Sequence, residues 1–152
     1  MATRSSRHEV QEIEEIRELL RSRQLRATPA RIAVMQILRE IQAPVTHADL
    51  AERLVPAGFD KATVFRNLSD LTDEGLLLRT ELGDHVWRFE LANLQHPDRN
   101  RHPHFVCLSC GRVQCLEPLE FTAGSKRRTQ EIGAVSEILL KGECQTCLET
   151  AG

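Results

Sequence analysis

The sequence predicts an α+β chain with an N-terminal winged helix-turn-helix domain followed by a small α/β domain that contains a four-cysteine zinc site. The first prediction rests on the order of elements in residues 9–91, where helical patterns precede a hairpin pattern. The second rests on two Cys-x-x-Cys pairs, Cys107 with Cys110 and Cys144 with Cys147. We expect the domains at 1–91 and 102–152, with the polar segment 92–101 as the linker.

Length and charge limit the functions that the chain can have. It has 152 residues and a formal net charge of −2; residues 1–79 hold 12 Lys and Arg against 12 Asp and Glu, and the remainder holds 8 against 10. Any contact with nucleic acid must therefore come from locally arranged arginines and not from bulk charge. We find no signal peptide and no window near the roughly 20 apolar residues of a membrane span, so a cytoplasmic protein without membrane attachment is expected.

Two helices are expected first. Apolar residues recur at helical spacing among Glu and Arg in residues 9–23, which indicates an amphipathic helix. A second apolar stripe follows Thr28 and Pro29, which suit an N-cap and the first helical position. These stripes are expected to form the core of the domain.

A short helix, a longer helix and a hairpin come next. Thr46 is expected to cap a helix that runs through Leu54, and Asp60 to cap a helix that Gly75 closes. Period-two alternation on either side of a Gly-Asp turn predicts a two-stranded hairpin over the segment LLLRTELGDHVWRFEL. This order is typical of a winged helix-turn-helix domain.

The helix-turn-helix order suggests residues that contact DNA. The second helix of such a pair enters the major groove, and the wing follows the phosphate backbone. The candidates for base contact are Lys61, Thr63, Phe65 and Arg66, and the candidates for phosphate contact are Arg26, Thr28 and Arg31. The alternative is that these arginines form an ordinary solvated face.

The two Cys-x-x-Cys pairs predict a closed tetrahedral site for a structural zinc, held by Cys107, Cys110, Cys144 and Cys147. In a reducing compartment such pairs favour metal binding over disulfides. The alternatives are four reduced buried cysteines or a redox-active pair, which normally lies at the start of a helix in a different fold.

His102 and His104 indicate a second, regulatory metal site. Two residues apart on a strand, both rings lie on one face. A hairpin tip at Leu108-Ser109 would place Cys115 opposite His102 and Val113 opposite His104, with Glu90 as a nearby carboxylate. A register shift of one would put Cys115 on the other face. The alternatives are a pair of surface histidines and, for the cysteine, a small buried hydrophobic residue.

Several motifs in order resemble the ferric uptake regulator family of metal-dependent repressors, over residues 20–148. They are QLRATPARIAVMQIL, KATVFRNL where the family's recognition helix typically reads ATVYR, FEL at the end of the wing, HPHFVCLSCGRV and CQTC. The resemblance implies a homodimer with a C-terminal dimerisation domain, a structural zinc held by four cysteines, and a sensor metal between the domains. Bound metal would favour a closed form that fits a palindromic double-stranded DNA operator.

The resemblance also assigns the sensor ligands, and it shows departures from the family pattern. Glu90, His102 and His104 match ligands, while the family's later carboxylate falls on Cys115 and a frequent histidine falls on Pro44. The substitutes for that histidine are His47 and, more remotely, His85. A further metal site of the family uses a histidine that aligns near Ser136, so this auxiliary site is expected to be absent. Phe65 replaces the tyrosine that is usual in the family's recognition helix.

A thiolate ligand shifts the expected regulatory metal from Fe2+ toward Zn2+, with manganese behind. The leading hypothesis is therefore a metal-dependent repressor. The alternatives are a peroxide-sensing repressor of the same family, a zinc-dependent hydrolase that would use Glu90 as its base, and a zinc-stabilised interaction module without a role on DNA.

Overall fold

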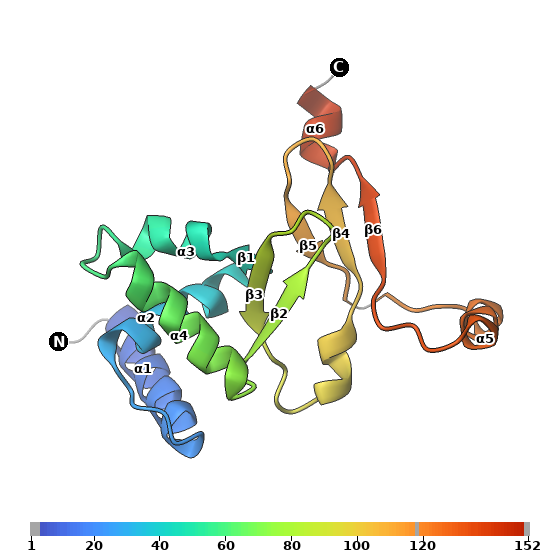
Figure 1. Cartoon of the computed structure of the whole chain (residues 1–152). Coiled ribbons are helices and arrows are strands. Elements are labelled where there is room, and N and C mark those ends of the chain that lie inside the picture. The colour runs from blue at the N-terminus through green and yellow to red at the C-terminus, as the bar shows by residue number, and fades with distance from the viewer. Residues whose placement is uncertain (1–3, 118, 151–152) are drawn as a thin grey trace. The chain divides into compact units, whose positions relative to one another are not determined.

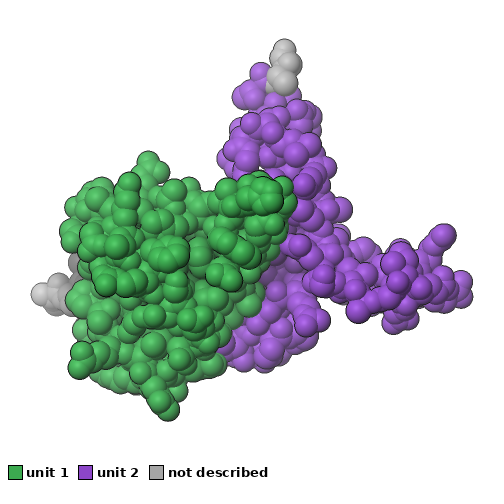
Figure 2. All heavy atoms as spheres, viewed as in Figure 1, with its two compact units in different colours: residues 1–92 green, residues 93–152 purple. Residues whose placement is uncertain are grey.

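The structure is a computed structural model that describes residues 4–117 and 119–150 (Figure 1). Residue contacts divide the chain into two compact units, 1–92 and 93–152 (Figure 2). The outer ends of the two predicted domains, residues 1–3 and 151–152, lie outside the described residues. None of the helices in the described ranges is both long and apolar enough to cross a bilayer.

The first unit starts with helices α1 (Arg4–Ser22) and α2 (Pro29–Ile41). The first helix begins earlier than the predicted residue 9. The predicted cap of α2 is confirmed, because the Thr28 hydroxyl accepts the N–H of Arg31 at 3.3 Å and Pro29 takes the first helical position.

Helices α3 (His47–Leu54) and α4 (Lys61–Asp73) form the helix-turn-helix pair. Thr46 caps α3 as predicted, in a reciprocal capping box with Asp49. Gly75 follows the end of α4 with φ +71°, a left-handed conformation that a residue with a Cβ adopts only at a cost. These local signals explain why the helices begin and end where the sequence predicts.

The hairpin belongs to a three-stranded sheet, whereas the sequence predicted two strands. Strands β2 (Leu77–Glu81) and β3 (Trp87–Leu91) pair antiparallel, and β1 (Val45–Thr46) pairs with the other edge of β3. The predicted alternation along β3 is only partly observed, since Arg88, Phe89 and Glu90 are all buried. β3 is the central strand of this sheet, with β1 on one edge and β2 on the other.

One hydrophobic core holds the first unit together. Fifteen buried residues form it, from all four helices and from the sheet. Burying each aliphatic or aromatic side chain of this kind contributes roughly 1.5–3 kcal/mol. The fully buried members include Ile16, Leu20, Met35, Leu38, Leu50, Val64, Leu68 and Leu71. Helix α4 thus turns Val64, Leu68 and Leu71 toward this core.

The second unit contains a 3-10 helix (Pro97–Arg101), strands β4 (His104–Cys107), β5 (Val113–Cys115) and β6 (Leu139–Gly142), and helices α5 (Ala123–Ile132) and α6 (Gln145–Thr150). The strand order is β5-β4-β6, with β6 parallel to β4. This parallel pairing was not predicted from the sequence. The strand carries the second cysteine pair back to the first.

The turn between β4 and β5 is centred one residue later than predicted. The pairing is therefore shifted by two residues: Cys115 lies opposite His104 rather than His102, and Val113 lies opposite Val106. Because side chains alternate with a period of two, a shift of two keeps each side chain on its predicted face. The predicted pairs were wrong, and the predicted common face of the histidines and Cys115 is correct.

Candidate metal centres and nucleic-acid interface

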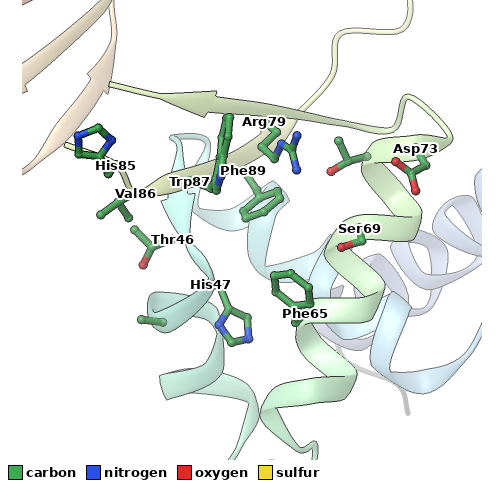
Figure 3. Close-up of a pocket in the computed structure, with 12 residues that line it drawn as sticks. Thr46, His47, Phe65, Ser69, Asp73, Arg79, His85, Val86, Trp87 and Phe89 are labelled. Atoms are coloured by element: carbon green, nitrogen blue, oxygen red, sulfur yellow. The ribbon is translucent and has the colours of Figure 1, made fainter. Parts of the chain in front are cut away.

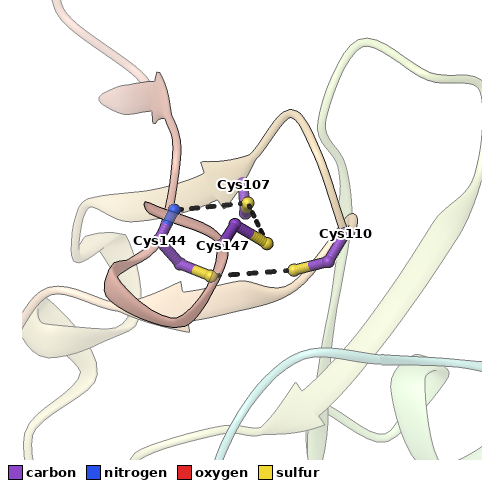
Figure 4. A group of neighbouring side chains, drawn as sticks. All are labelled: Cys107, Cys110, Cys144 and Cys147. Atoms are coloured by element: carbon purple, nitrogen blue, oxygen red, sulfur yellow. Dashed lines mark hydrogen bonds between the residues drawn. The ribbon is translucent and has the colours of Figure 1, made fainter. Parts of the chain in front are cut away.

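A four-cysteine group lies at the end of the second unit (Figure 4). β4 supplies Cys107 and the following turn Cys110, while Cys144 and Cys147 come from the segment after β6. Two sulfur–sulfur distances, Cys107–Cys147 and Cys110–Cys144, are 3.8 Å, and all four sulfurs lie within 4.8 Å of one another. Four sulfurs about 2.3 Å from a zinc ion are about 3.8 Å apart. The group fits one tetrahedral ion with no open position.

Hydrogen bonds polarise this cysteine group. The backbone amides of Cys110 and Cys144 donate toward the sulfur of Cys107, the second at 3.3 Å, and lower the pKa of the Cys107 thiol to about 6. Hydrogen bonds with the side chains of Cys144 and Cys110 raise the pKa of Cys147 to about 12. One thiolate therefore forms readily, and a bound cation must displace protons from the other thiols.

A second set of ligand atoms lies on the β4–β5 ladder. His104 pairs with Cys115, and the ring centroids of His102 and His104 are 4.6 Å apart. A ring nitrogen of each histidine and the Cys115 sulfur lie within 4.8 Å of one another. His104 is only 4% exposed. Two imidazoles and one thiolate can hold a single divalent ion and leave a position for a further ligand.

The backbone fixes the tautomer of His102. Its Nδ1 lies 2.8 Å from the carbonyl oxygen of Arg99 in the 3-10 helix. Because a carbonyl only accepts, Nδ1 carries the hydrogen and Nε2 carries the lone pair that a metal requires. Hydrogen bonds of this kind orient histidines that bind metals. Sequence reasoning missed this contact, since any residue can supply a backbone carbonyl.

Two predicted sensor residues belong to the first unit. Glu90 is 7% exposed and pairs with Leu78 in the sheet. His47 begins α3, where its Nε2–H donates to the carbonyl of Lys61 at 2.9 Å and its ring makes an edge contact with Phe65, at 5.7 Å between centroids. Neither metal-ligand group found in residues 4–117 and 119–150 includes His47. The contacts of this histidine instead hold the start of α4.

The exposed face of α4 carries most of the predicted DNA contacts. Lys61, Phe65 and Arg66 are exposed, with Phe65 at 54%. The hydroxyl of Thr63 donates to the Asp60 carboxylate at 2.8 Å and accepts from Arg66 at 3.2 Å. The Thr63 N–H also donates to Asp60 at 2.8 Å, which lowers the pKa of this carboxyl. Asp60 therefore caps the helix through Thr63, and the Thr63 hydroxyl in turn positions Arg66.

The predicted phosphate contacts near α2 divide into exposed and structural residues. Arg26 is exposed, and the Thr28 oxygen is occupied by the helix cap. The Arg31 side chain is only 13% exposed, and it forms an ion pair with Asp70 of α4 and donates to the carbonyl of Arg26 at 3.0 Å. The Arg31 charge thus lies against a carboxylate 39 residues later in the chain, and its contact with a phosphate stays a prediction.

Two arginines of the hairpin were not predicted as functional. Asp84 and Arg88 form an ion pair at 2.7 Å, and the hydrogen bond from Arg88 is the main reason why the pKa of Asp84 falls to about 2. The Arg79 guanidinium stacks on the Trp87 ring, 4.2 Å from its centroid. The i,i+4 spacing of the first pair is a signal in the sequence; the second is a diagonal contact that depends on strand register.

Comparison with known proteins gives consistent matches. The model of the Ferric uptake regulator family matches residues 22–138. The ferric uptake regulation protein of Escherichia coli K12 is 32% identical over 120 residues, which cover 76% of this chain and 74% of that protein. A zinc-bound manganese uptake regulator has a TM-score of 0.71 at 25% identity, over 85% of this chain and 98% of that chain. A zinc uptake regulator complexed with zinc and DNA has a TM-score of 0.56 at 21% identity, over 91% and 94%.

Proposed function

The chain belongs to the ferric uptake regulator family of metal-responsive transcription regulators, and we propose that it is a repressor whose dimer is closed onto a palindromic operator by a sensor metal. Its relatives and structural neighbours are regulators and not enzymes, which removes the zinc-dependent hydrolase from the alternatives. The repressor hypothesis accounts for both the helix-turn-helix pair and the metal-ligand groups.

The observation that carries this proposal is the chemical contrast between the two groups of the second unit. Four thiols form an all-sulfur set, whereas His102, His104 and Cys115 form a mixed set of nitrogen and sulfur donors. An all-thiolate set suits a permanent structural zinc, and a mixed set suits an ion that binds more weakly and reversibly. We assign the first role to the four cysteines and the sensor role to His102, His104 and Cys115.

We propose zinc as the sensor metal, slightly ahead of iron. The thiolate of Cys115 is a softer ligand than the carboxylate expected in the family, and soft ligands favour Zn2+ over Fe2+. Glu90, which the resemblance assigns as a fourth ligand, is an oxygen donor and favours iron. When bound, the ion would supply the free energy that shifts the dimer toward its DNA-competent form.

DNA recognition is assigned to α4. Lys61, Phe65 and Arg66 are exposed along this helix, and Arg26 is exposed just before α2, where a phosphate contact is feasible. The His47 bond to the Lys61 carbonyl and the Thr63 bond to Arg66 hold these groups in place before DNA binds. The start of α4 and the Arg66 guanidinium are therefore ordered before DNA binds.

A homodimer is supported by apolar side chains on the second unit. Its exposed large hydrophobic residues include Leu119, Ile132, Val135, Leu140 and Leu148, with Ile132 at 84%. An unpaired unit of this size that leaves so many apolar side chains in water is typical of a chain that associates. A second copy of the chain fits the twofold symmetry of a palindromic operator.

The proposal is tested with full-length protein on the duplex that metal-loaded wild type selects from a random-sequence pool. Added zinc is expected to raise affinity by roughly 5–150-fold over protein that mild chelation has stripped of the sensor ion. His104→Ala should abolish this response and retain the four-cysteine zinc; His96→Ala, an exposed histidine of the same unit, is the matched control.

Equal DNA affinity with and without metal would disprove the repressor mechanism. If anaerobic Fe2+ activates binding at lower free concentration than zinc, the repressor assignment stands and the sensor is an iron site. Loss of DNA binding on brief peroxide treatment of the iron form would identify a peroxide sensor.

A further inference from the structure

A groove of about 600 Å3 in the first unit lies between α4 and the β2–β3 hairpin (Figure 3). Phe65 and Ser69 of α4 face Trp87 and Arg79 of the hairpin across it. Phe65 is 54% exposed and Trp87 is 49% exposed. Two aromatic rings that stand half in solvent on opposite walls of a groove mark a surface built to bind.

Arg79 lines this groove, and its positive charge is not paired with a carboxylate among the described residues. Its guanidinium lies over the Trp87 ring at 4.2 Å, and no ion pair within residues 4–117 and 119–150 includes it. Stacking leaves the N–H groups at the edge of the guanidinium plane available to acceptors. The hairpin's other arginine, Arg88, is buried and paired with Asp84. The two arginines of the hairpin therefore differ in role: Arg88 stabilises the hairpin, whereas Arg79 is available to bind a ligand.

Resting on the proposed DNA-binding function, we propose that the groove seats one strand of the DNA backbone, that Arg79 contacts a phosphate, and that Trp87 is its positioning residue. The groove is continuous with the proposed base-reading surface, because Phe65 belongs to both. A planar guanidinium matches two phosphate oxygens. The hydroxyls of Thr46 and Ser69, which also line the groove, can donate to the same backbone.

Asp73 defines how far the backbone extends along the groove. This exposed residue lies one turn beyond Ser69 on the same wall of α4. Its carboxylate repels phosphate, so the strand is expected to leave the groove before it reaches the end of α4. A small anionic molecule that filled the whole groove would instead have to lie beside this carboxylate, which favours a polymer that crosses only part of it.

The test measures the salt dependence of DNA binding by full-length, metal-loaded protein on its selected duplex. Arg79→Ala should weaken binding about tenfold per half-site, and it should lower the slope of log K against log salt by about 0.9 for each phosphate that is no longer neutralised, about 1.8 for a dimer. Arg79→Lys should retain the slope. Arg53→Ala is the matched control, because Arg53 is an exposed arginine that Glu40 already neutralises at 3.5 Å.

Trp87 has its own readouts. Trp87→Ala should weaken binding about threefold with an unchanged salt slope, because the charge stays and only its ordering is removed, and Trp87→Phe should restore most of the affinity. Trp87 is the only tryptophan of the chain, so its emission reports the groove directly. Duplex should protect it from acrylamide quenching, and Asp73→Asn should raise affinity about twofold.

The outcomes separate the two proposals. Wild type that selects no duplex would overturn the proposed function and this inference with it. Wild type that binds its duplex in a metal-dependent way, while Arg79→Ala keeps the full salt slope or Trp87 stays open to acrylamide, would overturn only the groove assignment. Binding of a small molecule in the groove that competes with no DNA would do the same.

Discussion

Replacing Cys110 by serine is expected to unfold residues 93–152 and to leave residues 1–92 folded. Cys110 is exposed, so the exchange of sulfur for oxygen removes no buried packing. Its effect must therefore come through the ion that the four cysteines hold. Serine is a poor ligand for zinc, and three remaining thiols leave an open and weaker site.

The expected size of the effect follows from how little else stabilises the second unit. The buried hydrophobic residues described there are Cys107, Val113 and Cys144, and two of these three belong to the four-cysteine group. Burial of Val113 contributes roughly 2 kcal/mol, whereas ordering each residue costs about 1 kcal/mol or more. A structural zinc contributes about 10–16 kcal/mol in small zinc domains. The first unit has fifteen core residues and needs no ion.

The assay is amide hydrogen exchange of the full chain, combined with zinc analysis. In wild type, the bonds from His104 N–H to Ile138 and from Cys107 N–H to Arg112, at 3.1 and 2.9 Å, should protect β4. In Cys110→Ser, these amides should exchange at rates close to those of an unfolded chain, while the amides of α2 and α4 keep their protection.

Cys115→Ser is the control, since it makes the same atomic change outside the four-cysteine set, and it should keep β4 protected. The reasoning is refuted if Cys110→Ser has lost its zinc and still protects the β4–β6 ladder. In that case contacts between copies of the chain, and not the ion, would hold the unit together.

Four further outcomes are expected. Cys115→Ser should weaken zinc binding at the sensor site about tenfold or more and shift its selectivity toward iron. Competition with a chromophoric chelator measures the zinc affinity. An unchanged zinc affinity would remove this residue from the ligands. Phe65→Ala should weaken operator binding about tenfold, because the ring is proposed to contact a base. Its melting temperature should stay unchanged, because the ring is 54% exposed. A large drop in melting temperature would instead assign the ring to the core. Gly75→Ala should destabilise the first unit by about 1–2 kcal/mol in denaturant titrations, because φ there is +71°, and an unchanged midpoint would argue against this strain. The pKa of Asp84 is lowered from 3.8 to about 2, so its ion pair with Arg88 stabilises the hairpin above pH 4 and is lost as the pH falls toward 2. In wild type, the protection of the hairpin amides from hydrogen exchange should fall between pH 4 and pH 2. In Asp84→Asn, this pH dependence should be absent.

Most helix boundaries could be predicted because the signals that set them are local. Thr28, Thr46 and Asp60 each accept the N–H of the residue three positions later, and this geometry requires nothing outside one turn of helix. The short strand β1 could not be predicted, because two residues carry no periodic pattern. Its existence depends on β3, more than forty residues later in the chain.

The members of the four-cysteine group could be predicted from the sequence, whereas the strand pairing of Cys115 and the tautomer of His102 could not. Two Cys-x-x-Cys pairs specify a tetrahedral site by spacing alone, and the structure brings their sulfurs within 4.8 Å. The pairing of Cys115 with His104 required the tertiary structure, because the register depends on where the turn is centred. The tautomer of His102 was also beyond the sequence, since its partner is the backbone carbonyl of Arg99.

The sequence by itself determined the fold class, the helix caps, the closed cysteine set and the common face of the two histidines with Cys115. These follow from side-chain chemistry and from periods of 3.6 and 2 residues, which act over short distances along the chain. Only the tertiary structure decided which arginines are neutralised by carboxylates. Arg31 is neutralised by Asp70 and Arg88 by Asp84, whereas Arg79 is displayed on Trp87. The physical reason is that the state of a charge depends on its neighbours in space, and for Arg31 and Arg79 those neighbours are set by helix packing and strand register.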